Sequence, residues 1–195
     1  MAIEKKLLER MNYMNIFLVR HGQDDESVRG GWCNHGLMPE GIEQSQKLGE
    51  ELAHTYFDSI FSSDLNRAKE TAEIIVSNLD VKTEIEYTKE LREINNGLLA
   101  GMKNELAEKE YPGLYYKALQ YDEQYPLGES PKDFYQRILN FWNKKLLHLN
   151  TKNILIVTHG GVINILLHLF NDIPYSNKVT KFPVKTGTVF KIELQ

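Results

Sequence analysis

Two short apolar runs constrain the fold of this chain more than any other feature of its sequence. Residues 15–20 are Asn-Ile-Phe-Leu-Val-Arg, and residues 153–158 are Asn-Ile-Leu-Ile-Val-Thr. Neither run alternates between apolar and polar positions, which is typical of strands buried on both faces of a parallel sheet. A sheet of this kind needs helices on both faces, so the two runs favour an α/β fold.

The rest of the sequence supplies patterns for the other elements. Further strands are expected at residues 57–62 and 83–87, with an edge strand within 186–194. Helices are expected at residues 40–55, from Asp64 as N-cap to about residue 79, and from Ser130-Pro131 to about residue 149. We therefore predict a three-layer αβα sandwich with a mostly parallel sheet.

The chain length of 195 residues suggests one domain, covering residues 1–195. Within it, residues 95–128 show no long periodic pattern and are expected to form an insertion over the active site. Residues 1–11 are expected to form a short helix outside the core. The charged residues of this first stretch also mean that it lacks the apolar core of a secretory signal.

Charge, apolar runs and cysteine content limit the binding partners and the cellular compartment that we expect for this protein. The net charge is −4, which offers no overall attraction for nucleic acid or an anionic membrane. No apolar run approaches the ~18–20 residues that a membrane span requires. Cys33 is the only cysteine, so the chain has no intramolecular disulfide. We expect a soluble cytoplasmic protein, and the sequence leaves its oligomeric state open.

Both of the apolar strands run into a histidine followed by glycine. The first continues as Arg20-His21-Gly22, and the second as His159-Gly160-Gly161. Ligands of open α/β sheets bind beyond the carboxyl ends of the strands, so the two histidines converge if the strands are neighbours. Glycine next to each histidine lets backbone amides approach an anion at a helix start. The pattern predicts an anion site that contains two imidazoles and an arginine.

The run Leu-Val-Arg-His-Gly-Gln at residues 18–23 resembles the signature of the histidine phosphatase superfamily, on its phosphoglycerate mutase-like branch. Further similarities follow in the order that the family shows. They lie at residues 31–41, 62–72, 91–93 with Gly97 and Gly101, 128–130, and 158–161. The resemblance covers nearly the whole chain and implies a phosphoglycerate mutase-like fold.

The resemblance also implies roles for individual residues, and these agree with what phosphoryl transfer requires. A phosphomonoester needs an in-line nucleophile and positive charge around its oxygens. His21 is the expected nucleophile, with its other ring nitrogen donating to a backbone carbonyl. Glu93 is the expected proton donor and later base. The expected phosphate ligands are Arg20, Arg67, His159 as a cationic or hydrogen-donating imidazole, and the Gly160 amide. No metal or cofactor is implied.

The chain departs from the family pattern after Gln23. Asp24, Asp25 and Glu26 follow it, and we expect these acids mainly to be solvated, with selection of a basic substrate group or metal binding as alternatives. Ser27 is the candidate for the place of an asparagine that contacts phosphate in the family. Glu129, which precedes Ser130, is expected to belong to a helix cap.

These features together predict a phosphomonoesterase that hydrolyses a small phosphorylated metabolite through a phosphohistidine on His21. Phosphoglycerate mutase-type transfer is the main alternative, because it uses the same pocket. A metal-dependent phosphoesterase with His21, Asp24, Asp25 and His159 as ligands is another. A non-enzymatic phosphate-binding or phosphate-sensing module is the third, although binding alone does not need His21 and Glu93 together.

Overall fold

The computed structural model describes residues 13–194, so the short helix expected at residues 1–11 lies outside the described residues. At its centre is a five-stranded sheet with the order β3-β2-β4-β1-β5. The strands are β1 (Met14–Arg20), β2 (Ser59–Ser63), β3 (Ile85–Thr88), β4 (Asn153–Thr158) and β5 (Val189–Leu194). All neighbouring pairs are parallel except β1 and β5, so the mostly parallel sheet and its edge strand are confirmed.

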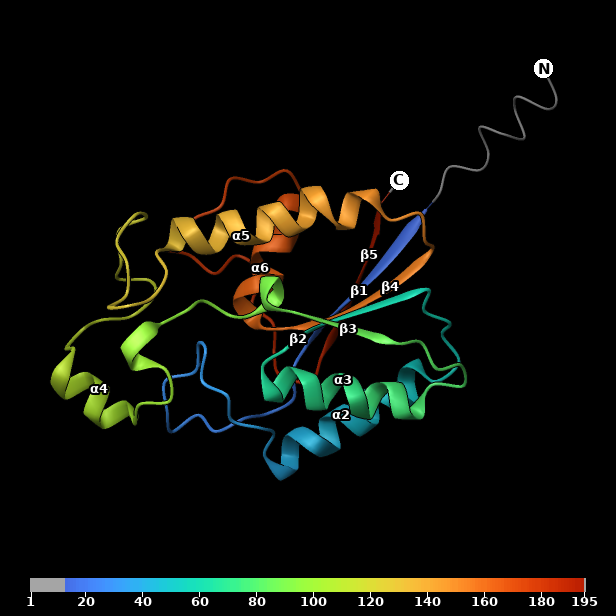
Figure 1. Cartoon of the computed structure of the whole chain (residues 1–195), viewed down its shortest axis with the longest axis horizontal. Coiled ribbons are helices and arrows are strands. Elements are labelled where there is room, and N and C mark those ends of the chain that lie inside the picture. The colour runs from blue at the N-terminus through green and yellow to red at the C-terminus, as the bar shows by residue number, and fades with distance from the viewer. Residues whose placement is uncertain (1–12, 195) are drawn as a thin grey trace, which may run out of the picture.

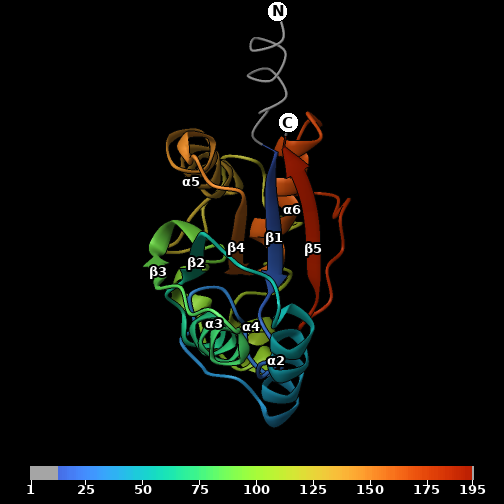
Figure 2. The same ribbon diagram turned by 90° about the vertical axis from the view of Figure 1, so that its right-hand side faces the viewer.

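Helices cover both faces of this sheet, as Figures 1 and 2 show. The long helices are α2 (Pro39–Leu52), α3 (Asn66–Asn78), α5 (Pro131–Lys144) and α6 (Gly160–Phe170). Successive residues of a strand face opposite sides of the sheet. Accordingly, Ile156 packs in the apolar cluster with α5 and α6, whereas Val157 packs in the cluster with α2 and α3. The two apolar clusters therefore sit on opposite faces, and the predicted three-layer sandwich is confirmed.

Of the expected helix caps, Ser130 is confirmed, whereas Asp64 and Glu129 are wrong. Helix α3 begins at Asn66 and has no side-chain cap. Asp64 instead accepts hydrogen bonds from Arg92 at 2.6 and 2.7 Å, which lowers the pKa of the Asp64 carboxyl. Helix α5 is capped reciprocally by Ser130 and Asp133, so the preceding glutamate is not needed there.

The segment at residues 95–128 contains one short α-helix, α4 (Asn104–Glu110), and one 3-10 helix, η2 (Gly97–Leu99), and otherwise consists mainly of turns and loops. Figure 1 shows α4 set apart from the three layers. The segment rests on the loop that follows β1, because the amide of Gly101 donates to the carbonyl of Arg29 at 2.8 Å and that of Asn104 to Ser27 at 2.9 Å. Among residues 13–194, no helix combines the length and apolar character that crossing a bilayer requires.

The register of the two central strands determines where the site forms. In the parallel pair of β1 and β4, Arg20 lies opposite Thr158. The next residue of each strand is a histidine, so His21 and His159 leave the sheet side by side at its carboxyl edge. This is the arrangement that the sequence predicts.

Candidate active site

His21 is a buried imidazole whose two nitrogens have different surroundings. His21 is only 4% exposed, and its Nδ1 lies 2.8 Å from the carbonyl oxygen of Gly22. Because a carbonyl can only accept, Nδ1 carries the proton and Nε2 keeps its lone pair. The Nε group of Arg67 donates to that Nε2 at 3.3 Å. The expected bond to a backbone carbonyl is therefore confirmed, and Nε2 faces the site.

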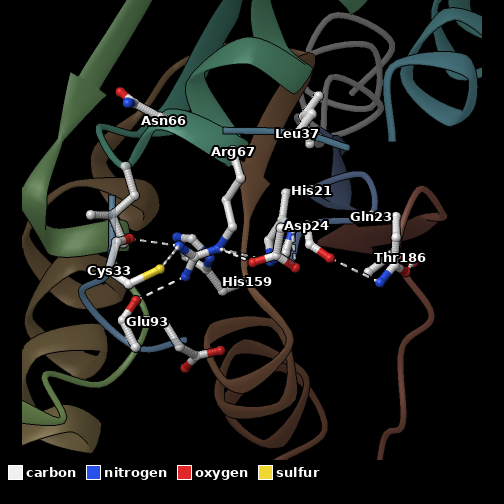
Figure 3. A network of polar contacts seen from close by, with 12 residues as sticks. His21, Gln23, Asp24, Cys33, Leu37, Asn66, Arg67, Glu93, His159 and Thr186 are labelled. Atoms are coloured by element: carbon white, nitrogen blue, oxygen red, sulfur yellow. Dashed lines mark hydrogen bonds and ion pairs between the residues drawn. The ribbon is translucent and has the colours of Figure 1, made fainter. Parts of the chain in front are cut away.

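His159 lies beside His21, with 5.0 Å between the ring centroids (Figure 3). It is fully buried, and its Nε2 lies 2.8 Å from the hydroxyl oxygen of Ser63 at the end of β2. Its Nδ1 is buried and has no hydrogen-bond partner within the described chain. A buried polar atom without a partner costs free energy, so this nitrogen marks a place for a ligand atom.

Burial and neighbouring cations keep both imidazoles neutral in the unliganded site. Burial is the main cause that lowers the pKa of His21 well below 6.5, with the positive charge of Arg67 next. The pKa of His159 is lowered for the same two reasons. A cationic His159 is therefore disfavoured, and His21 is a neutral imidazole.

Arg67 is 2% exposed and lies at the start of α3. Its Nη1 donates to the carbonyl of Cys33 and its Nη2 to that of Gly31, both at 2.8 Å. These bonds fix the guanidinium plane, so that its Nε edge meets His21. The sequence analysis expects Arg67 to be a phosphate ligand, and in the structure both of its Nη groups also hold a loop (Figure 3).

Arg20 approaches the same place from the end of β1. Its Nη1 donates to the carbonyl of Val184 at 2.6 Å, and its Nε is buried without a partner in the described chain. A Cβ atom placed on Gly160 would lie 3.5 Å from that Nε, so the guanidinium lies over the start of α6. Arg20 therefore offers a second unpaired donor beside the histidines.

Glu93 places its carboxylate at the amino end of α6. Its Oε2 accepts from the amide of Gly161 at 3.0 Å, and its Oε1 accepts from that of Ile94 at 3.1 Å. A Cβ atom on Gly161 would lie 2.2 Å from Oε1, so only glycine leaves room for this contact. The amide donors and the helix dipole hold the carboxylate in position.

Two cavities meet at Arg20 and Glu93, which line both of them. One, of about 300 Å³, contains His21, Arg67 and the loop after β1. The other, of about 390 Å³, extends along α6 and is lined partly by the aromatic side chains of Tyr116, Tyr175 and Phe182. Glu93 thus stands between a compartment lined by charged side chains of both signs and a more apolar one.

Two expectations about the loop after β1 differ from the structure. Ser27 is exposed and does not line the smaller cavity, so it does not lie with the other predicted phosphate ligands. Asp24 is not solvated like its neighbour Glu26, because its side chain is only 15% exposed and its Oδ2 lies 3.3 Å from Arg67 Nε. Residues 13–194 contain no group of three or more His, Cys, Asp or Glu side chains that could hold a metal ion.

Arg137 is a residue of the site that sequence reasoning missed. It donates to the carbonyl oxygens of Glu90 and Arg92 at 2.8 Å and of Glu93 at 3.1 Å. Both of its contacts with the Glu129 carboxylate are 2.8 Å, so Glu129 is the partner of Arg137 and not part of a helix cap. Helical periodicity places Arg137 on α5 but gives no signal of these bonds.

The fold and the site define an α/β protein with two buried histidines beside arginine side chains at the carboxyl edge of its sheet. Comparison with known proteins agrees. Residues 16–195 match the model of the histidine phosphatase superfamily, branch 1. A probable phosphatase of Schizosaccharomyces pombe is 33% identical over 164 residues, which cover 78% of this chain and 71% of the relative.

Two further matches cover more of the chain. A 2,3-bisphosphoglycerate-dependent phosphoglycerate mutase of Parvibaculum lavamentivorans is 28% identical over 189 residues, or 92% of this chain and 90% of the relative. The crystal structure of the alpha-ribazole phosphatase from Shigella flexneri aligns with a TM-score of 0.82 at 26% identity, covering 93% and 91% of the two chains. The protein belongs to the histidine phosphatase superfamily and has its phosphoglycerate mutase-like fold.

Proposed function

We propose that this protein is a phosphomonoesterase that acts through a phosphohistidine on His21. Nε2 of His21 attacks phosphorus in line with the leaving oxygen, so that a P–N bond forms as the P–O bond breaks. Glu93 gives its proton to that oxygen. Glu93 then takes a proton from water, whose oxygen attacks phosphorus, and the P–N bond breaks to release orthophosphate and restore His21.

The observation that carries this proposal is the state of His21. Its Nδ1 proton is committed to Gly22, its Nε2 lone pair faces Arg67, and burial favours the neutral ring. The Nε donor of Arg20 lies beside it without a partner, as does Nδ1 of His159, which is a donor when Nε2 accepts from the Ser63 hydroxyl. A bound phosphoryl group would give both donors a partner while it accepts the lone pair of Nε2.

The larger cavity supports a small organic leaving group on the Glu93 side. Its walls include Tyr116 and Tyr175, whose hydroxyls hydrogen-bond to each other. Burial raises the pKa of both phenols, so they remain neutral hydrogen-bonding groups at pH 7. A phosphorylated metabolite with a partly apolar or ring-shaped body fits such walls. Relatives named alpha-ribazole phosphatases make alpha-ribazole phosphate one compound to test.

The working form that we propose is a single domain that needs no metal or cofactor, with no nucleic acid or membrane as partner. Arg20, Arg67 and His159 surround the reacting phosphoryl group, together with the Gly160 amide. A reducing compartment such as the cytoplasm suits the one cysteine, Cys33, which is free and buried.

The test is a hydrolysis screen over a panel of phosphorylated metabolites, with and without a chelator. We expect release of orthophosphate that is unchanged in chelator and absent in His21→Ala. Loss of activity in chelator would favour a metal-dependent enzyme. Binding of substrates without turnover by the wild-type protein would favour a phosphate-sensing module.

Phosphoglycerate mutase-type transfer remains the second candidate because relatives bear that name. It predicts rapid interconversion of 2- and 3-phosphoglycerate with little orthophosphate. We expect the opposite ratio, since a mutase must shield its phosphohistidine from water. An assay that follows both products from the same reaction decides between these two candidates.

A further inference from the structure

The cationic edge that faces His21 already holds an anion of the protein itself. Both Nη groups of Arg67 donate to backbone carbonyls, so its Nε edge is the part that meets the reacting nitrogen. The Asp24 carboxylate lies at this edge, with Oδ2 3.3 Å from Arg67 Nε and Oδ1 4.0 Å from His21 Nδ1. Figure 3 shows Asp24 beside both side chains.

A phosphoryl group bound to His21 Nε2 would bring its oxygens to the same edge. The Nε group of Arg67 is 3.3 Å from Nε2, so an oxygen on phosphorus there must be a close neighbour of Arg67. Two like charges at such short range repel each other by an amount that burial increases. The Asp24 carboxylate and the substrate phosphoryl group therefore compete for one cation.

Little else holds the Asp24 carboxylate in this position. Within residues 13–194 its one ion pair is with Arg67, its other close contact is the neutral ring of His21, and no hydrogen bond ties either carboxylate oxygen to another group. The chain next to it turns outward, because Glu26 is exposed. Rotation of the Asp24 side chain toward this exposed loop would free Arg67 without a change in the fold.

We infer that Asp24 is an internal competitor for the phosphoryl site, an inference that rests on the proposed function. In the free enzyme its carboxylate neutralises Arg67, and it leaves when a phosphomonoester binds. Orthophosphate has no organic group to place in the larger cavity, so it meets this competition with fewer compensating contacts than a substrate does. Asp24 thereby favours substrate over product and is a specificity-determining residue.

The experiment compares Asp24→Asn and Asp24→Ser with Glu26→Gln. The Glu26 variant removes the same charge two residues away, from an exposed side chain that lines the same cavity but has no contact with Arg67. The dissociation constant of orthophosphate is measured by calorimetry at pH 7.5, and its inhibition constant against p-nitrophenyl phosphate by initial rates. Thermal unfolding tests whether each variant is folded. If Asp24→Asn does not fold, Asp24→Ser takes its place in the comparison.

We expect both Asp24 variants to bind orthophosphate at least about tenfold more tightly than the wild type, because one close like charge is gone. The Glu26 variant should stay within about threefold of the wild type. Unchanged or weaker orthophosphate binding in the Asp24 variants overturns the inference, as does an equal gain in Glu26→Gln. If the wild type neither binds orthophosphate nor hydrolyses any ester, the proposed function itself is wrong. If it does hydrolyse, only the role of Asp24 is in question.

Discussion

The two histidines of the site are distinguished by the partner of a single ring nitrogen. His21 uses Nδ1 for the Gly22 carbonyl, whereas His159 uses Nε2 for the Ser63 hydroxyl. Each therefore turns a different nitrogen toward the space between them and the arginines. Under the proposed function, this difference would let one imidazole serve as the nucleophile while the other contacts an oxygen of the same phosphoryl group.

The lowered pKa values of the histidines make stability depend on pH. In the unfolded chain a histidine takes up a proton near pH 6.5, whereas the buried ring stays neutral to lower pH. Between these values the unfolded state binds more protons, so stability falls as the pH falls below about 6.5. Each ring contributes up to about 1.4 kcal/mol per pH unit.

We therefore predict that His159→Asn flattens the loss of unfolding free energy between pH 7 and pH 5 relative to the wild type. Urea unfolding at several pH values measures this slope. A variant with the same slope as the wild type would show that His159 does not remain neutral in the folded protein.

Glu93 allows a second prediction at this scale. Glu93→Gln keeps the shape of the side chain but cannot move a proton, so turnover should fall at least about 100-fold. The affinity for orthophosphate should change by less than about threefold, because Arg20, Arg67 and His159 are intact. Steady-state rates and calorimetry measure the two quantities. Undiminished turnover would reject Glu93 as the acid and base.

At the scale of elements, the amino end of helix α6 packs closely against Glu93 because Gly161 has no side chain. Gly161 leaves space for the Glu93 carboxylate, whereas a Cβ on Gly160 would make only ordinary contacts with Arg20. Neither glycine has a positive φ among the described residues, so space and not backbone freedom decides these positions. The amino end of α6 is thus shaped around Glu93.

The adjacent glycines provide a matched pair of variants. Gly161→Ala should lower turnover by more than about tenfold, since the added methyl group would lie 2.2 Å from Glu93 Oε1 and displace the carboxylate. Gly160→Ala should have a much smaller effect. Initial rates and thermal unfolding measured on both variants test this, and equal losses of activity would contradict the packing argument.

The strands and their ends could be predicted from the sequence. Continuous apolar runs are typical of buried parallel strands, and the carboxyl ends of such strands lie at one edge of the sheet. The meeting of His21 and His159 follows directly from neighbouring β1 and β4. The inward position of Asp24 could not be predicted from the sequence. It depends on the position of Arg67, which is fixed by a carbonyl oxygen 34 positions away in the chain. Arg137 was missed for a similar reason, since it lies 44 positions along the chain from Glu93.

At the scale of the whole molecule, the site lies where the three layers and the irregular segment at residues 95–128 come together. Arg20 from β1 and Glu93 from the turn after β3 line both cavities. A ligand bound there would contact several parts of the chain at once. Binding should therefore stabilise the complete domain against unfolding.

This expectation is measurable with orthovanadate, an analogue of the phosphoryl group. At 100 times its dissociation constant a ligand adds about 2.7 kcal/mol to folding, which corresponds to a rise in Tm of roughly 5–10 °C for a chain of this size. Arg20→Met should lose most of this rise, because it removes an unpaired donor. No shift in the wild type would place the oxyanion site elsewhere.

The most direct measurement is the detection of the phosphoryl group on the enzyme. Glu93→Gln is mixed with p-nitrophenyl phosphate, which needs little help from an acid to leave, and the reaction is quenched in base. Mass spectrometry of peptides is then expected to find one base-stable, acid-labile phosphoryl group on His21, and none in Glu93→Gln that also carries His21→Ala. Phosphorylation of another residue, or full hydrolysis by His21→Ala alone, would contradict the account.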